Sequence, residues 1–248
     1  MGLSIISYLS QKDGAEIDRF EHASRTIPSW LACPEVTEVV VVDWGSDTSL
    51  YSAFKEWGWV DDRLKIVEIN TSLPLSISKA LNIAAQFTGK GVLCRLGIDH
   101  LLLRPDFFTD VKYGLAPNTF IAGLDYPLSV SLPPDSKHLQ GIFYMPRDIF
   151  FGVAGYNEDL VGYCGEDNDL YRRLTLLGQK QRRFDMLNVY DKFITHIDHP
   201  RNRVAELKED DWNEQNISSK HMWNNIENSM QKVKIIEGNE TLTVCRLV

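Results

Sequence analysis

Short apolar runs alternate with amphipathic stretches over the first hundred residues, and this alternation constrains the fold more than any other feature. The apolar runs are rich in β-branched residues and predict strands at 3–10, 38–45, 64–70 and 91–99. The stretches between them have helical spacing, at 14–32 with an interruption expected at Pro28, at 49–57 and at 76–87. Such alternation predicts parallel strand pairing with helices on both faces of the sheet.

The pattern loosens after Pro105, where the strands of a mixed sheet are expected. The segments that read as strands are 120–127, 140–151 and 184–199. A helix over 206–231 and a last strand at 240–247 are expected in the more polar C-terminal part. The sequence therefore predicts an α/β fold with a mixed, mostly parallel sheet flanked by helices.

Composition excludes several classes of protein. A net charge of −8 argues against a nucleic-acid binder, which needs a basic face for phosphates. No apolar run approaches the roughly 20 residues of a membrane span, and because no basic segment precedes the first apolar run we expect no secretory signal. Four scattered cysteines are typical of reduced thiols, so we expect a cytoplasmic protein. The glycine patterns of dinucleotide-binding and P-loop enzymes are missing from the sequence.

Ligands of open α/β sheets bind beyond the carboxyl ends of the strands, so the residues after each predicted strand are the first to inspect. These are Tyr8, the stretch from Asp43 to Asp47, and Asp99 with His100. The Asp43 carboxylate suits a base edge or ribose hydroxyls, and Gly45 permits close backbone approach. A polar turn that merely ends a strand is the alternative.

A carboxylate and two histidines suggest a metal site. Asp99 follows the fourth predicted strand, and His196 and His199 lie in a later one. Carboxylate and imidazole ligands together suit Mn²⁺ as well as Zn²⁺. Because residues three apart on a strand point to opposite faces, only one of the two histidines is expected to be a ligand. Hydrogen-bonded structural histidines are the alternative.

The segment 162–178 places three carboxylates, Glu166, Asp167 and Asp169, at the start of a predicted helix. The helix dipole favours acidic residues there by roughly 0.3–1 kcal/mol each, which explains one or two of them. The preceding glycines are not needed for that purpose and let a backbone approach a ligand closely. A catalytic base held at the helix start is therefore the favoured interpretation.

Four segments together resemble glycosyltransferases of the GT-A fold. "EVVVVDWGSD" and "SKALNIAAQFTGKGVLCRLGIDHLLLRPDFF" resemble the nucleotide-binding half of the family 2 enzymes. "GYCGEDNDLYRRL" and "FITHIDHPRN" resemble the C-terminal motif of the β-1,4-galactosyltransferase and chondroitin-polymerase relatives. The resemblance implies a GT-A domain over 1–202, with a nucleotide-sugar-binding half at 1–105, an acceptor half at 106–202 and an extension at 203–248.

The resemblance also implies roles for the matched residues. Asp99 matches the last acid of the D-x-D motif, which coordinates the metal, and His196 matches the downstream metal ligand. Glu166 and Asp167 match the catalytic acidic pair at the acceptor, and Asp167 is the candidate base that takes the acceptor proton, in a single displacement with inversion. The residues expected around the nucleotide are Tyr8, Asp43, Gly45, Ser46, Lys79, Asn82, Ile98 and Asp99, and those near the sugars are Tyr163, Gly165 and Glu166.

One departure from the family pattern is Gly97, which stands where the first acid of D-x-D is usual. It implies a different donor, weaker metal use or loss of activity, and His100 is a weaker candidate for the missing ligand. The function expected is transfer of a sugar from a UDP-sugar, with Mn²⁺ or Mg²⁺, to a saccharide or glycolipid, and another glycosyltransferase domain or a second copy as a partner. A nucleotidyltransferase, a sugar-binding pseudoenzyme and a retaining transferase are the alternatives.

Overall fold

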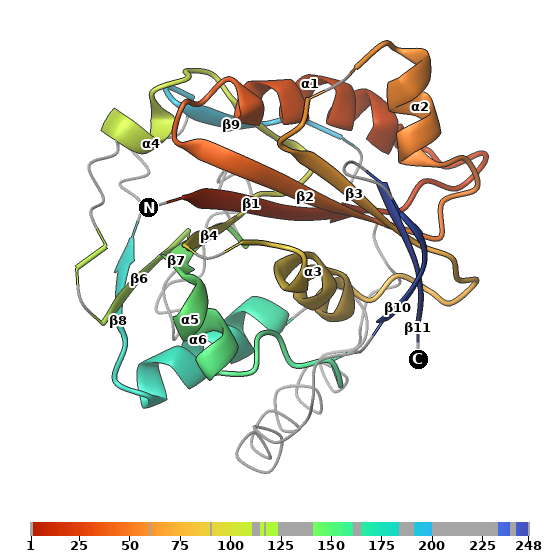
Figure 1. Cartoon of the computed structure of the whole chain (residues 1–248). Helices are drawn as coiled ribbons and strands as arrows, with labels where there is room; N and C mark the ends of the chain where they lie inside the picture. Colours follow the sequence, from red (N-terminus) through yellow and green to blue (C-terminus); the bar gives the residue numbers. More distant parts are fainter. Residues whose placement is uncertain are drawn as a thin grey trace.

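A nine-stranded sheet organises the computed structural model (Figure 1), with strand order β10-β11-β3-β2-β1-β4-β7-β6-β8. The structure describes residues 2–59, 61–89, 91–110, 115–116, 118–123, 141–160, 165–183, 191–199, 233–238 and 242–247. The strands of this sheet are β1 Leu3–Leu9, β2 Val36–Trp44, β3 Leu64–Ile69, β4 Val92–Arg95, β6 Thr119–Ala122, β7 Phe143–Pro146, β8 Lys180–Arg183, β10 Val233–Gly238 and β11 Leu242–Leu247.

The middle of the sheet is parallel and its flanks are mixed. Strands β3, β2, β1 and β4 pair in parallel, as β11 does with β3 and β6 with β8. Antiparallel pairs join β4 to β7, β7 to β6, and β10 to β11. This confirms the predicted fold class. The carboxyl ends of β1 to β4 consequently share one edge, where ligands of such sheets bind.

Helices cover both faces of the sheet (Figure 1). The helices are α1 Arg19–Leu31, α2 Leu50–Glu56, α3 Ile77–Gln86, α4 Phe107–Asp110, α5 Arg147–Gly152 and α6 Glu166–Leu176. Alternate residues of the central strands feed two apolar cores. In β2, Val39 and Val41 pack with α1 and α2, whereas Val40 and Val42 pack with α3, α5 and α6. The continuous apolar run in this strand therefore reflects burial on both faces.

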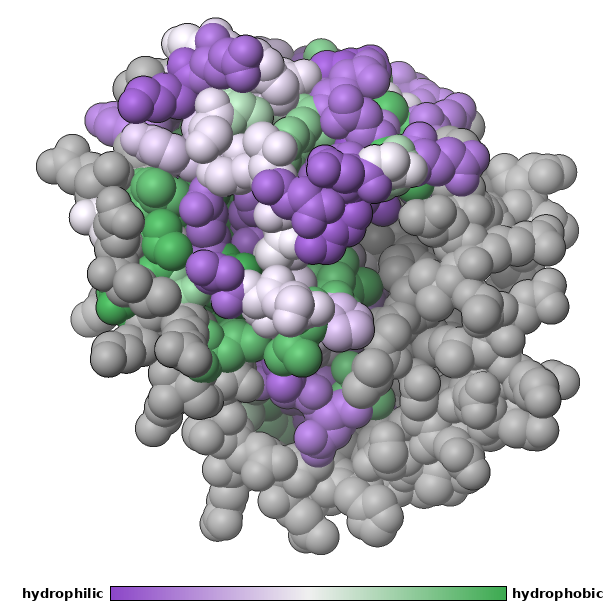
Figure 2. All heavy atoms as spheres, turned by 90° about the vertical axis from the view of Figure 1, so that its right-hand side faces the viewer, coloured by the Kyte–Doolittle hydropathy of each residue, from purple (hydrophilic) through white to green (hydrophobic). Residues whose placement is uncertain are grey.

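The surface toward which β1, β2 and β3 run is shown in Figure 2, and hydrophilic side chains gather in its upper half, over α1 and α2. Among the described residues, none of the helices has the length and apolar character needed to cross a membrane.

Two expectations about local structure were wrong. Helix α1 runs through Pro28 without interruption, because Ile27 and Trp30 beside it are fully buried and their packing outweighs one lost hydrogen bond. The strand expected over 140–151 is a strand only to Pro146, after which α5 begins. Proline favours helix starts, and Pro146 stands at the N-cap of α5.

Other strands are shorter than expected or absent from the prediction. The run 91–99 forms a strand only over β4 and then turns, and β5 (His100–Leu102) pairs antiparallel with β9 (Ile194–His196) in a separate small sheet. Strands β5, β8 and β10 were not predicted, because β5 is short and β8 reads KQRR. The last strand, expected over 240–247, is confirmed as β11, whereas the helix expected over 206–231 lies outside the described residues.

Candidate active site

The segment from Gly97 to His100 forms a tight turn at the carboxyl end of β4. The backbone N–H of Gly97 donates to Nδ1 of His100 across 2.7 Å. Helix α1 holds the turn from outside, because Thr26 donates to the Ile98 carbonyl across 3.0 Å and the Trp30 indole donates to the His100 carbonyl across 2.8 Å. The position of Asp99 is thus fixed by the turn and by one buried face of α1.

The turn also explains why glycine occupies position 97. A Cβ at this position would lie 2.4 Å from Asp99 Oδ1 and 2.7 Å from His100 Nδ1. Gly97 therefore makes room for the side chain that follows it. Because the Nδ1 atom of His100 accepts a hydrogen bond from this turn, His100 does not replace the missing acid, and it is not among the described groups that could hold a metal.

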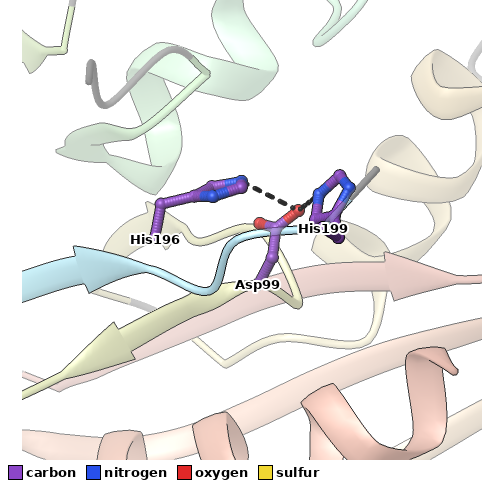
Figure 3. Close-up of side chains that lie close together, drawn as sticks. All are labelled: Asp99, His196 and His199. Atoms are coloured by element: carbon purple, nitrogen blue, oxygen red, sulfur yellow. Dashed lines mark hydrogen bonds and ion pairs between the residues drawn. The ribbon is translucent and has the colours of Figure 1, made fainter. Parts of the chain in front are cut away.

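Both predicted histidines reach the same carboxylate oxygen (Figure 3). The Nε2 atoms of His196 and His199 lie 3.4 and 3.2 Å from Asp99 Oδ2. The expectation that only one histidine could contribute was wrong, because β9 ends at His196 and the alternation of a strand does not extend to His199. Pairing of β5 with β9 and a 2.8 Å hydrogen bond from Ile197 N to the Asp99 carbonyl bring the segments together.

The donor set of this cluster fits a divalent ion. One ligand atom each from Asp99, His196 and His199 lies within 4.8 Å of the others. Burial opposes ionisation of Asp99, but hydrogen bonds from the two histidines outweigh it and hold the pKa of that carboxyl well below its usual range. An ionised carboxylate with two imidazoles is a ligand set that Mn²⁺ and Zn²⁺ accept.

Helix α1 places two further side chains against the cluster. Arg19 Nη1 lies 4.0 Å from Asp99 Oδ2, and the ring centroid of His22 lies 5.7 Å from that of His199. Burial lowers the pKa of His22, which favours its neutral form. Neither residue was singled out from the sequence, because Arg19 and His22 sit in an ordinary amphipathic helix pattern.

The three carboxylates at the start of α6 have different surroundings, although all are buried. Asp169 Oδ2 accepts from Nε and Nη2 of Arg173, one helical turn away, at 2.8 and 2.6 Å. The ion pair of Asp169 with Arg173 therefore links two successive turns of α6. Gly165 is the N-cap with a φ of 86°, and a Cβ there would meet no atom of the described residues within 4 Å. Its positive φ explains the glycine.

Asp167 and Glu166 face Arg95 at the end of β4. Asp167 Oδ1 is ion-paired with Arg95 Nη1 and lies 3.0 Å from the Tyr156 hydroxyl. Glu166 Oε1 lies 3.9 Å from Arg95 Nη2. Burial and then the charge of Asp167 raise the pKa of Glu166 to about 7, against the opposing effect of Arg95. The interpretation of the sequence missed Arg95, although an arginine within the apolar run VLCRLGID was a signal that could have been followed.

The residues expected at the nucleotide make internal contacts after β2. Asp43 is 3% exposed; its Oδ2 accepts from Leu50 N at 2.8 Å and its Oδ1 from the Ser46 hydroxyl. Burial raises the pKa of Asp43 to about 6, opposed by these hydrogen bonds. The close approach that Gly45 permits is to the chain itself, since a Cβ there would lie 2.3 Å from the Thr71 carbonyl oxygen.

The other residues expected near the nucleotide belong to the sheet and to α3. Tyr8 in β1 is half-buried, and the side chain of Ile98 packs in the apolar core under α1. Asn82 is fully buried and binds both backbone polar atoms of Tyr156, whereas Lys79 on the same helix is half-buried. Tyr163 lies outside the described residues.

Comparison with solved structures identifies the fold. The catalytic domain of Drosophila β-1,4-galactosyltransferase 7 in complex with xylobiose aligns with 100% of this chain and 93% of its own length, at 13% identity and a TM-score of 0.57. The Pyrobaculum calidifontis mannosyltransferase PcManGT in complex with GDP-Man and Mn²⁺ aligns over 81% of this chain and 58% of its own, at 14% identity and a TM-score of 0.59. This chain has the GT-A fold.

A family model described as the N-terminal domain of galactosyltransferase matches residues 132–200 of the GT-A chain. The matched span includes the acidic start of α6 and both histidines that lie against Asp99. A search of curated protein sequences finds no match. The likeness of this GT-A domain to known enzymes is therefore carried by its structure and by the span that the family model matches.

Proposed function

We propose that the protein is a metal-dependent, inverting glycosyltransferase that moves a sugar from a UDP-sugar to a hydroxyl group of a saccharide or glycolipid. The observation that carries the proposal is the cluster of Asp99, His196 and His199 next to the carboxyl edge of a GT-A sheet. A nucleotide diphosphate carries charge that a protein of net charge −8 must meet locally, and a divalent ion held by this cluster meets it.

Asp99, His196 and His199 would hold Mn²⁺ or Mg²⁺, and the chemistry that such an ion supplies is stabilisation of negative charge on the departing diphosphate. Arg19 is close enough to the cluster to contact the same phosphates. The nucleotide would lie along the ends of β1, β2 and β4 and beside α3. The residues proposed there are Tyr8, Asp43, Gly45, Ser46, Lys79, Asn82 and Ile98.

The acceptor would enter beside the start of α6, near Tyr163, Gly165 and Glu166. Asp167 takes the proton from the acceptor hydroxyl. The acceptor oxygen forms a bond to the anomeric carbon as the bond from that carbon to the diphosphate oxygen breaks, and the electron pair leaves with the diphosphate. One displacement inverts the anomeric configuration, which NMR of the product would check against a retaining mechanism.

Two compared structures support a nucleotide-sugar donor but differ in its base. A variant of the Drosophila enzyme, aligned over 100% of this chain at 12% identity and a TM-score of 0.58, was solved with manganese, UDP-Gal and xylobiose. The archaeal enzyme was solved with GDP-Man and Mn²⁺. The donor panel in a test must therefore include both nucleotides.

The test is release of UDP or GDP from a panel of nucleotide sugars, with Mn²⁺ and with EDTA, and with xylobiose and longer saccharides as acceptors. Metal-dependent release from one donor would support the proposal. Asp99→Ala should abolish metal-dependent binding of the nucleotide, whereas Asp167→Asn should retain that binding and lose turnover. Absence of metal-dependent UDP or GDP binding in the unaltered protein would favour the sugar-binding pseudoenzyme.

A further inference from the structure

Arg95 is a buried charge at the end of an otherwise apolar strand. It is 7% exposed, and its neighbours Val92, Leu93 and Cys94 complete a fully buried β4. Buried ion pairs are frequently replaceable by apolar residues without loss of stability, so stability alone gives no reason for an arginine here. Its contacts are instead with the acidic residues at the start of α6.

The surroundings of the guanidinium fix it in one place. Arg95 Nη1 donates to the Tyr156 hydroxyl across 2.9 Å, and Cζ lies 5.5 Å from the centre of the Tyr156 ring. Asn82 clamps Tyr156 by accepting from its N–H at 2.8 Å and donating to its carbonyl at 2.9 Å. Gly141, with a φ of 81°, leaves space that a Cβ would take, since that atom would lie 2.9 Å from Arg95 Cζ.

These contacts are directed at one oxygen of Asp167. Arg95 and the Tyr156 hydroxyl both bind Oδ1. Burial raises the pKa of Tyr156 well above its usual value, against the opposing charge of Arg95, so its hydroxyl keeps the proton that it donates. Among the described residues, the hydrogen bonds of this carboxylate all go to Oδ1, and Oδ2 is the oxygen left for an acceptor hydroxyl.

The same segment of chain carries the metal ligand. Asp99 follows Arg95 by four residues, so their Cα atoms are at most about 14 Å apart even in a fully extended chain. Arg95 contacts the acceptor side through Asp167, and Asp99 contacts the donor side through His196 and His199. The segment from Arg95 to Asp99 therefore positions both the proposed base and the proposed metal ligands.

We propose that Arg95, clamped by Tyr156, is a positioning residue for sugar transfer: it binds Oδ1 of Asp167, turns Oδ2 toward the acceptor, and compensates the charge of the Glu166–Asp167 pair. This inference rests on the proposed function. A proton taken by Oδ2 comes from the acceptor hydroxyl, and Arg95 itself exchanges none. Misplacement of a reacting group by about 1 Å costs on the order of 100-fold in rate, which sets the expected effect.

Three variants test the inference kinetically. Arg95→Met should lower kcat about 100-fold while the KM of the donor and the UDP affinity with Mn²⁺ change less than about 3-fold. Arg95→Lys keeps the charge and Tyr156→Phe keeps the aromatic ring, so both variants should lose less kcat than Arg95→Met. Arg173→Met is the matched control, because Arg173 is equally buried and pairs with Asp169 in the same helix. The control should lower thermal stability and leave kcat of the folded protein near normal.

A second measurement can be made without a nucleotide-sugar donor. Arg95 lowers the pKa of Glu166, so carboxyl-carbon NMR should show the Glu166 midpoint at higher pH in Arg95→Met than in the unaltered protein, with Glu166→Gln used for assignment. Tyr156 and, in α6, Tyr171 also interact with Asp167, and Tyr8 of β1 interacts with Arg95. Tyr156 and Tyr171 stay neutral over this range, because burial raises the pKa of both hydroxyls.

The outcomes separate failure of the inference from failure of the proposed function. Folded Arg95→Met with kcat within about 3-fold of normal, or with an unmoved Glu166 midpoint, would overturn the role of Arg95. Loss of UDP binding in parallel with kcat would overturn it as well. If Arg95→Met does not fold, Tyr156→Phe carries the same kinetic test. Undiminished turnover in Asp167→Asn would instead reject the base assignment on which the proposal rests.

Discussion

At the scale of single residues, the packing of the turn before Asp99 accounts for a glycine at position 97. The turn leaves a Cβ at this position 2.4 Å from Asp99 Oδ1 and 2.7 Å from His100 Nδ1. Restoring the family's acid with Gly97→Asp should therefore displace Asp99 and weaken Mn²⁺ affinity at least 10-fold in calorimetry, and Gly97→Ala should do the same. Gly152→Ala, where a Cβ meets no atom within 4 Å, is the control. Tighter metal binding by Gly97→Asp would contradict this account.

At the same scale, burial of Glu166 should make the stability of the folded protein depend on pH. Its pKa is about 7 in the folded protein, above the value of roughly 4.3 in an unfolded chain. The folded protein thus binds the proton more tightly, and this contribution is present below pH 4.3 and lost as the pH rises to 7. Glu166→Gln should be more stable than the unaltered protein at pH 8, by up to about 3 kcal/mol.

The comparison is of urea unfolding curves at pH 5 and pH 8, with Glu21→Gln, an exposed glutamate of α1, as the control. The gain of Glu166→Gln should be smaller at pH 5, where Glu166 of the folded protein is neutral. An equal difference at both pH values would show that burial does not hold the proton on Glu166.

At the scale of elements, α1 supports the candidate metal site of Asp99, His196 and His199. Thr26 donates to the carbonyl of Ile98, directly before Asp99. Thr26→Val removes the donor with almost no change in shape and leaves a buried carbonyl unpaired, which costs on the order of 1–3 kcal/mol. We expect a lower unfolding midpoint together with weaker Mn²⁺ binding. Ser24→Ala, on the exposed side of α1, should change neither quantity. Normal Mn²⁺ affinity in Thr26→Val would show that this hydrogen bond from α1 does not support metal binding.

Helices and strands could be predicted from the sequence where the spacing of apolar residues follows directly from which faces are buried. The run from Val39 to Val42 is apolar because both faces of β2 are covered, and the stripe of Ile77, Leu81 and Ala84 is the buried side of α3. The candidate metal ligands Asp99, His196 and His199 could be singled out from the ends of strands and from the family resemblance, and the structure brings them together. The pairing of Arg95 with Asp167 joins residues 72 apart, and no periodicity encodes such a contact. Short or polar strands such as β5 and β8 escape prediction for the same reason.

At the scale of the whole molecule, the described part of the C-terminal region completes the sheet. Strand β11 pairs with β3, and Asn70 N donates to the Cys245 carbonyl across 3.1 Å. Cys245 is fully buried in the core that α3 shares with α5 and α6. The extension expected from the sequence thus contributes strands to the same sheet as β1 to β4.

Removal of residues 233–248 should therefore destabilise the whole domain rather than release a separate unit. It would expose the edge of β3 and part of the core beside α3, and unpaired strand edges promote aggregation. Cys245→Asp places a charge in that core with the chain otherwise intact, and it should lower the stability of β1, β2 and β3 as well. Hydrogen exchange read at β1, β2 and β3 measures this directly. Unchanged protection of those strands in Cys245→Asp would show that β10 and β11 fold apart from the rest.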